Sequence, residues 1–252
     1  MMNLVGRTAI VTGAARGLGR TYAQKLMEAG MNVVVADKAD TKETLGLMYG
    51  PGKALGVSVD VADFKSTGAM AERALGAFGR IDVLVNNAAL YGGLKGGRAE
   101  QIDEAEWDRC MAVNVKGVWN CCRAVIPEMR KQGGGSIVNV ASLAALYGLP
   151  YALHYSAAKA AVIGMTRALA RELGRDWIRV NAIAPTAVLT EGTKEFFGAK
   201  FEKGMATIRE NQSLKRNLQS EDLAGTVLYL AGDASKFVTG QTIMVDGGTH
   251  VL

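Results

Sequence analysis

The sequence is poor in cysteine, and its three cysteines fit neither a metal site nor a disulfide framework. They are Cys110, Cys121 and Cys122; two are adjacent, and none belongs to a Cys-x-x-Cys pair or a Cys/His cluster. Structural zinc sites and disulfide-rich folds depend on such spacings. We therefore expect reduced thiols, no bound metal and a cytoplasmic protein.

Long hydrophobic runs are also missing. The longest apolar stretch, residues 137–153, is interrupted by Asn139, Ser142, Gly148 and Pro150. A membrane-spanning helix needs about 20 consecutive apolar residues. The segment before the first predicted strand carries no apolar signal core. We expect neither a membrane span nor a membrane partner.

A strong excess of charge of one sign is absent as well. The 29 Lys and Arg and the 24 Asp and Glu leave a net charge of +5, and the densest basic pairs are Arg130-Lys131 and Lys215-Arg216. Proteins that bind nucleic acids usually gather basic residues on one face or stripe. The scattered charges predict a mildly basic surface and no nucleic-acid partner.

What the chain does have is an alternation of short, apolar, β-branched runs with longer helical patterns. Such runs are typical of strands buried on both faces, and the alternation predicts right-handed crossovers and a parallel sheet. No linker or repeat divides residues 1–252, so we predict one α/β domain, a doubly wound Rossmann fold with helices on both faces. Strands are predicted at 9–11, 32–36, 54–59, 83–85, 136–140, 179–184 and 242–245, and helices at 18–29, 63–78, 104–131, 154–173 and 221–230.

Residues 186–220 form the least regular stretch, between the sixth strand and the last helix. A long segment of uncertain structure inside a compact domain is usually functional. We predict a substrate lid here. A packed pair of surface helices without such a role is the alternative.

A glycine-rich turn, Thr12 to Gly19, follows the first strand and leads into a helix. Gly13 allows a tight turn, Gly17 lets the backbone approach a pyrophosphate, and Gly19 lets the helix pack closely on the strand. The helix N-terminus then offers free N–H groups and a positive dipole end to phosphates. This pattern predicts a dinucleotide site.

Asp37 ends the second strand, where a carboxylate accepts hydrogen bonds from the adenosine ribose and repels the extra phosphate of NADP. Arg16 and Lys38 act in the opposite sense, because either can pair with that phosphate. We predict NAD as the cofactor, with NADP as the alternative.

Tyr155 and Lys159 are four residues apart and share one face of a helix. A tyrosine has a pKa near 10, and a neighbouring ammonium together with an oxidised nicotinamide is expected to lower it. Such a phenol can take a proton from an alcohol or give one to a carbonyl oxygen. Ser142 follows an apolar strand, at the edge where open α/β sheets bind ligands, and can hydrogen-bond the substrate oxygen. Asn114 lies within an apolar helix and needs a polar partner, either a backbone carbonyl or a water.

These motifs resemble the short-chain dehydrogenase/reductase family over essentially the whole chain. The elements that match, in order, are Thr12 to Gly19, Asp60-Val61, Asn86 to Ala89, Asn114, Ser142, Tyr155/Lys159, Asn181 to Pro185 and Gly240 to Gly248. Ala89 and Thr186 depart from the pattern, since the family usually carries glycine at both positions. Both are small residues, so we expect a slightly altered turn.

The resemblance implies a seven-stranded sheet and NAD(P)-dependent hydride transfer between a cofactor and a CH–OH or carbonyl carbon. It implies that Tyr155 is the catalytic acid/base, that Lys159 lowers its pKa and holds the nicotinamide ribose, that Ser142 orients the substrate oxygen and that Asn114 supports a water in a proton relay. The cofactor contacts expected are Gly13, Arg16, Gly17, Leu18, Gly19, Asp37, Asp60, Val61, Asn87, Ala88, Tyr155, Lys159, Pro185, Val188 and Thr190.

The resemblance also implies a homotetramer, in which the helices at 104–131 and 154–173 pair between subunits. An NADP(H)-dependent carbonyl reductase and a non-catalytic cofactor sensor on the same fold are the alternative functions. By family analogy the substrate pocket is apolar and aromatic. This predicts a neutral, fairly bulky secondary alcohol or ketone, with Leu94, Ala144, Tyr151 and Phe196 among its contacts.

Overall fold

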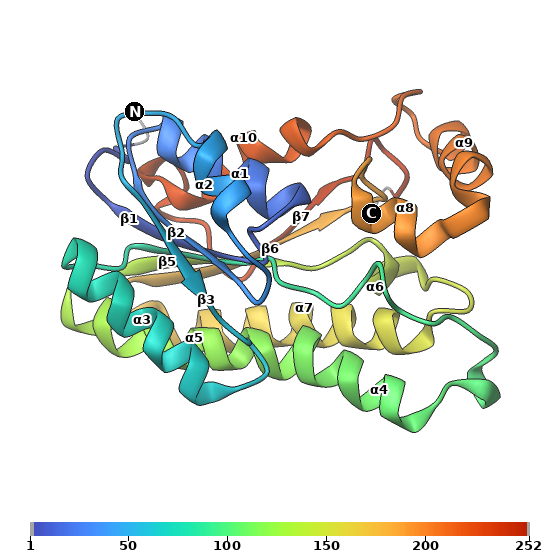
Figure 1. The fold of residues 1–252 in the computed structure, drawn as a ribbon, viewed down its shortest axis with the longest axis horizontal. Coiled ribbons are helices and arrows are strands. Elements are labelled where there is room, and N and C mark those ends of the chain that lie inside the picture. Colours follow the sequence, from blue (N-terminus) through green and yellow to red (C-terminus); the bar gives the residue numbers. More distant parts are fainter. Residues whose placement is uncertain (1–2, 251–252) are drawn as a thin grey trace.

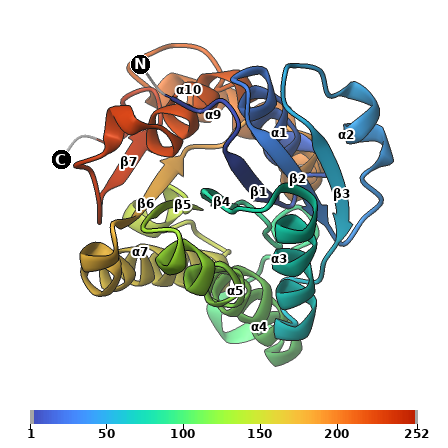
Figure 2. The ribbon, with the colours of Figure 1, turned by 90° about the vertical axis from the view of Figure 1, so that its left-hand side faces the viewer.

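A computed structural model describes residues 3–250 and places seven strands in one sheet. The strands are β1 (Thr8–Thr12), β2 (Asn32–Asp37), β3 (Ala54–Ser58), β4 (Val83–Asn86), β5 (Gly135–Val140), β6 (Ile178–Pro185) and β7 (Thr242–Val245). All neighbours pair in parallel, in the order β3-β2-β1-β4-β5-β6-β7 (Figures 1 and 2). The predicted fold class is confirmed.

Helices cover both faces of this sheet (Figure 2). They are α1 (Gly17–Glu28), α2 (Lys42–Leu47), α3 (Phe64–Phe78), α4 (Glu104–Met111), α5 (Gly117–Lys131), α6 (Ala144–Tyr147), α7 (Leu153–Leu173), α8 (Glu191–Phe197), α9 (Phe201–Asn211) and α10 (Ser220–Ala231). Apolar residues of α3, α5 and α7 pack on one face, and those of α1 and α10 pack on the other. No helix within residues 3–250 is both long enough and apolar enough to cross a bilayer.

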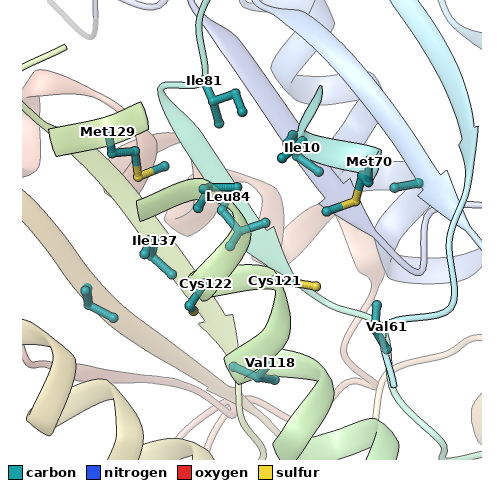
Figure 3. Close-up of a cluster of buried hydrophobic side chains, with 14 of the residues drawn as sticks. Ile10, Val61, Met70, Ile81, Leu84, Val118, Cys121, Cys122, Met129 and Ile137 are labelled. Carbon is teal, nitrogen blue, oxygen red and sulfur yellow. The ribbon is translucent and has the colours of Figure 1, made fainter. Parts of the chain in front are cut away.

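The buried core explains why the strands were readable from the sequence. Every residue of β1 and of β4 is buried, as expected for strands covered by helices on both faces. Figure 3 shows one cluster, in which Ile10, Leu84 and Ile137 of the sheet meet Met70 and Cys121 of the covering helices.

All three cysteines are free and buried, and burial raises the pKa of Cys122 to about 12. These thiols belong to the interior packing.

The order of the strands indicates where a ligand is expected to bind. β1 pairs with β2 on one side and with β4 on the other, so the chain reverses its direction of progress across the sheet between these neighbours. In open α/β sheets, ligands bind outside the carboxyl ends of the strands at such a switch point. The ends of β1 and β4 are Thr12 and Asn86.

Three local features differ from the sequence prediction. The expected helix at 104–131 consists of α4, a π-helical turn η2 (Ala112–Lys116) and α5. The short helices α2 and α6 carry too few residues to show a periodic pattern. The stretch 186–220 contains α8 and α9, which lie together at one end of the molecule (Figure 1).

Candidate active site

A cleft of about 900 Å³ lies at the carboxyl ends of the strands. Residues that follow β1 to β6 line it, together with residues of α8 and α9. Fourteen of the fifteen cofactor contacts expected from the sequence lie along it, and Gly19 is the exception. Ser142 lines the same cleft, so the structure brings the dinucleotide motifs and the proposed reactive residues together.

The glycine-rich turn fits a phosphate. Gly13 has a φ of +65°, and a Cβ there would lie 2.7 Å from the Cα of Ala88, so only glycine fits. The N-terminus of α1 has no side-chain cap, which leaves its first N–H groups available to an anion. A Cβ on Gly19 would collide with the carbonyl oxygen of Gly13. Gly19 therefore serves the close packing of α1, away from the cleft.

Asn87 braces this turn from the end of β4. Its side-chain amide donates to the carbonyl oxygens of Thr12 (3.0 Å) and Gly13 (2.9 Å). The hydroxyl of Thr12 accepts the N–H groups of Asn87 and Ala88, each at 3.1 Å. These bonds tie the phosphate turn, which follows β1, to the end of the neighbouring strand β4.

Asp37 lies at the end of β2 and holds the same turn from the other side. Its Oδ2 accepts the N–H of Ala15 at 2.9 Å, and its Oδ1 accepts the N–H of Ala39 at 2.9 Å. A carboxylate oxygen has two lone-pair sites, so each oxygen can still accept a ribose hydroxyl. The residues present therefore fit an adenosine dinucleotide.

The two cations near Asp37 are each held by a carboxylate. Lys38 Nζ lies 2.7 Å from Asp60 Oδ2, and a hydrogen bond from Lys38 lowers the pKa of Asp60. Arg16 forms two parallel hydrogen bonds to Glu195 of α8, at 2.5 and 2.9 Å. The hydrogen bond from Arg16 lowers the pKa of Glu195.

Ser142, Tyr155 and Lys159 meet at the other end of the cleft. Ser142 follows β5, and its Oγ accepts the N–H of Ala144 at 3.2 Å. Tyr155 lies in the first turn of α7, and Lys159 lies one turn later. Lys159 Nζ donates to the carbonyl oxygen of Val140 at 2.7 Å and lies 5.8 Å from the centre of the Tyr155 ring.

Burial dominates the electrostatics of these residues. It raises the pKa of Tyr155 above its ordinary value, while a hydrogen bond with Ser142 acts in the opposite direction. Burial also lowers the pKa of Lys159 to about 8. Burial alone therefore favours the protonated phenol. The lowered pKa expected from the sequence requires the charge of an oxidised nicotinamide as well as Lys159, and it stays a prediction.

Asn114 lies in the π-helical turn and is fully buried. Its Oδ1 accepts the N–H of Leu90 at 2.7 Å, and its Nδ2 donates to the carbonyl oxygen of Leu90 at 3.0 Å. The side chain does not line the cleft. The structure provides a backbone carbonyl partner, and these bonds position the loop after β4. The role of Asn114 in a proton relay through water stays a prediction.

Of the four expected substrate contacts, Ala144 lines the cleft, and Leu94, Tyr151 and Phe196 do not. Leu94 is buried in a cluster with Ala144 and Tyr155, and Tyr151 is 69% exposed with a φ of +63°. Phe196 stacks on Tyr91, with ring centres 4.6 Å apart. Tyr91 itself lines the cleft, and its ring centre is 5.2 Å from that of Tyr155.

Sequence reasoning missed Arg109, Tyr147 and Glu195. Tyr147 and Arg109 line the cleft, and Glu195 binds Arg16. Tyr147 is three residues after Ala144, so recognition of the short helix α6 would have indicated it. The sequence carries no signal for the other two, because their positions depend on how α4 and α8 pack.

Proteins of known sequence and structure are similar to this chain over nearly its whole length. A family model described as enoyl-(acyl carrier protein) reductase matches residues 13–250. An uncharacterized oxidoreductase of Mycobacterium tuberculosis is 45% identical over 245 residues, which cover 96% of each chain.

Two similar solved structures contain a nicotinamide cofactor. A 3-ketoacyl-(acyl-carrier-protein) reductase from Brucella melitensis, complexed with NADH, has a TM-score of 0.90 and 33% identity, covering 99% of this chain and 100% of that chain. A candidate NAD(P)-dependent gluconate 5-dehydrogenase from Beutenbergia cavernae, with NADP bound at low occupancy, has a TM-score of 0.90 and 37% identity, covering 98% of this chain and 97% of that chain.

Proposed function

The chain belongs to the short-chain dehydrogenase/reductase family, and we propose that it transfers a hydride between NAD(H) and a neutral, fairly bulky secondary alcohol or ketone. It is an NAD(P)-dependent oxidoreductase acting on CH–OH or carbonyl groups. The observation that carries the finer proposal is the arrangement of the cleft. A phosphate turn lies at one end, and Ser142, Tyr155 and Lys159 lie at the other.

We assign the proton-transfer step to Tyr155. Its phenol is protonated at neutral pH, which is the form that donates to the oxygen of a carbonyl substrate during reduction. Ser142 and Tyr155 line the same cleft, and we assign to the Ser142 hydroxyl the orientation of that oxygen. Lys159 supplies a buried ammonium one helical turn away, which favours the phenolate that remains. The nicotinamide, when bound, supplies or accepts the hydride.

Two observations support NAD over NADP. The carboxylate of Asp37 lies where the adenosine ribose is expected, and it would repel a 2′-phosphate. The cations that could offset this repulsion, Arg16 and Lys38, are paired with Glu195 and Asp60. The similar Brucella structure binds NADH, and the similar Beutenbergia structure binds NADP, so family membership alone favours neither.

The lining of the substrate end supports a neutral substrate. Its side chains are mostly apolar or aromatic, and they include Leu90, Tyr91, Ala144, Tyr147, Leu149, Phe197 and Ile208. Arg109 also lines the cleft, but its guanidinium is 2.8 Å from Glu106. A carboxylate or phosphate entering this pocket would need a cation to compensate for its lost hydration. Ala144 remains our proposed substrate contact, whereas Phe196 supports Tyr91 from behind.

We propose that residues 186–220 form a substrate lid. Thr190, Thr193 and Phe197 line one wall of the cleft, and Ile208 of α9 joins them. Two contacts hold α8 against the rest of the site: the Arg16–Glu195 ion pair and the Tyr91–Phe196 stack. A lid that closes over substrate excludes water from the reacting atoms.

We also propose a homotetramer, by analogy with the family. Trp119 of α5 is 46% exposed and Phe237 is 95% exposed, and large apolar side chains at a surface suit subunit contacts. Light scattering of the purified protein measures its mass directly, and a monomeric mass would exclude the tetramer.

A panel of carbonyl substrates tests the proposed reaction. The purified protein is assayed with NADH and with NADPH against neutral aryl and cycloalkyl ketones, 2-oxo acids, sugar phosphates and a 3-oxoacyl thioester, by following the cofactor's absorbance. We expect the highest kcat/KM with NADH and a neutral bulky ketone. A clear preference for a charged substrate would refute the proposed substrate class, and a preference for NADPH would refute the proposed cofactor.

A further inference from the structure

The ion pair between Arg16 and Glu195 joins two segments that line the cleft, the phosphate turn and α8. Arg16 belongs to the phosphate turn and Glu195 belongs to α8, 179 residues later in the chain. Both carboxylate oxygens take part, in the parallel arrangement that makes Arg–carboxylate pairs specific in geometry. The pair therefore fixes the direction in which the Arg16 guanidinium points.

The surroundings of Glu195 fix its own position. A Cβ on Gly92 would lie 3.1 Å from Cβ of Glu195 and would collide with Oε2, so the absence of a side chain at Gly92 makes room for the carboxylate. The next residue, Phe196, stacks on Tyr91. The side chain of Thr190 caps α8 by accepting the N–H of Thr193 at 3.3 Å. Glu195 is thus presented to Arg16 by a well-anchored helix.

Arg16 lies beside the expected adenosine site. The N–H of the preceding residue, Ala15, binds the carboxylate of Asp37, and Asp37 is near enough to act electrostatically on the Arg16 guanidinium. Without Glu195, this guanidinium would be free to turn toward Asp37 and toward any phosphate on the ribose. The other nearby cation, Lys38, is bound to Asp60.

We propose that Glu195 is a cofactor-specificity residue that acts from the lid. By holding Arg16 against α8, it withholds the guanidinium from an adenosine 2′-phosphate and so disfavours NADP. This proposal rests on the proposed preference for NAD, and it adds a residue distant in sequence from the nucleotide motifs. Asp37 repels the phosphate directly, whereas Glu195 removes the cation that would offset that repulsion.

The expected effect is modest, because both side chains are about half exposed. Ion pairs of this kind are weak in water and are screened by salt. Glu195→Gln is expected to lower the Kd for NADP⁺ about two- to fivefold at low ionic strength, with little change in the Kd for NAD⁺. The gain is expected to shrink as salt is added.

The test is calorimetric titration of the purified protein with NADP⁺ and with NAD⁺, in the absence of a substrate. Glu202→Gln is the matched control, because it removes the same charge from an exposed position on α9. Arg16→Gln and the double variant complete a cycle, in which the gain from Glu195→Gln should vanish once Arg16 is absent. Circular dichroism and thermal midpoints check that each variant is folded.

An NADP⁺ affinity unchanged in Glu195→Gln would overturn the proposal. So would a gain that persists without Arg16 or one that Glu202→Gln reproduces, since either outcome would indicate a general effect of net charge. An unmodified protein that binds NADP⁺ more tightly than NAD⁺ would contradict the proposed cofactor preference, while the shift between variants would still measure the effect of Glu195. Binding of neither nucleotide would overturn both proposals.

Discussion

Lys159→Met is expected to stabilise the folded protein at neutral pH while removing turnover. Lys159 is 3% exposed, and burial lowers its pKa from 10.5 to about 8. This shift means that burying the charged ammonium lowers the free energy of unfolding by about 3 kcal/mol. Methionine has a similar length and carries no charge. The substitution also removes the hydrogen bond from Lys159 to the Val140 carbonyl, which costs about 1–2 kcal/mol. The free energy of unfolding is therefore expected to rise by about 1–2 kcal/mol.

The pH dependence of this gain follows from the direction of the shift. Below pH 8 the lysine is charged in both the folded and the unfolded chain, and its burial opposes folding fully. Between about pH 8 and pH 10.5 the unfolded chain binds more protons, so the stability of the unmodified protein rises with pH. Above pH 10.5 both states are neutral at this site, and the advantage of the variant disappears.

The assay is denaturant-induced unfolding of both proteins without cofactor, at pH 7 and at pH 10. The difference between the two free energies of unfolding isolates residue 159, because the other titrating groups are common to both proteins. Lys203→Met, at an exposed position on α9, is the control and should change stability little at either pH. The reasoning is refuted if Lys159→Met is less stable than the unmodified protein at pH 7, or if the difference does not depend on pH.

Two further substitutions probe the nucleotide end of the cleft. Gly13→Ala is expected to weaken NAD⁺ binding at least tenfold, because a Cβ in the left-handed region costs about 1–2 kcal/mol and would also meet Ala88. Gly68→Ala on α3, where a Cβ meets nothing within 4 Å, should leave NAD⁺ affinity unchanged, and equal affinities in the two variants would contradict the account. Asp37→Ala should move the ratio of kcat/KM values toward NADP; a ratio that stays constant or moves toward NAD would show that Asp37 does not exclude the phosphate.

The parts of the fold that the sequence predicts are those determined by burial along a single segment. Runs such as Val33 to Ala36 are buried on both faces, so they read as continuous apolar stretches and their strands were located within a residue or two. The short helices α2 and α6 have 6 and 4 residues, too few for a helical period to stand out. The π-helical turn around Asn114 depends on the bonds between its side chain and Leu90, which lies 24 residues earlier.

The candidate site also has a part that the sequence predicts and a part that only the packing of distant segments determines. The glycine turn, Asp37, Ser142, Tyr155 and Lys159 can be located from the sequence because each lies at a strand end or at a fixed helical spacing. The pairing of Arg16 with Glu195 and the burial that raises the pKa of Tyr155 arise from packing between distant segments. The expected contact Phe196 lies behind Tyr91 for the same reason: the sequence does not determine how α8 turns relative to the loop after β4.

The most direct test of the central claim compares Tyr155→Phe with the unmodified protein in cofactor binding and in turnover. The ring remains and only the proton-transfer hydroxyl is lost, so the Kd for NAD⁺ should stay within about twofold. Proton transfer by a positioned side chain typically contributes about a hundred- to ten-thousandfold, and kcat with the best ketone or alcohol should fall by that factor. Turnover within a few-fold of the unmodified protein, with the variant folded and NAD⁺ bound, would contradict the assignment of Tyr155 as the acid/base.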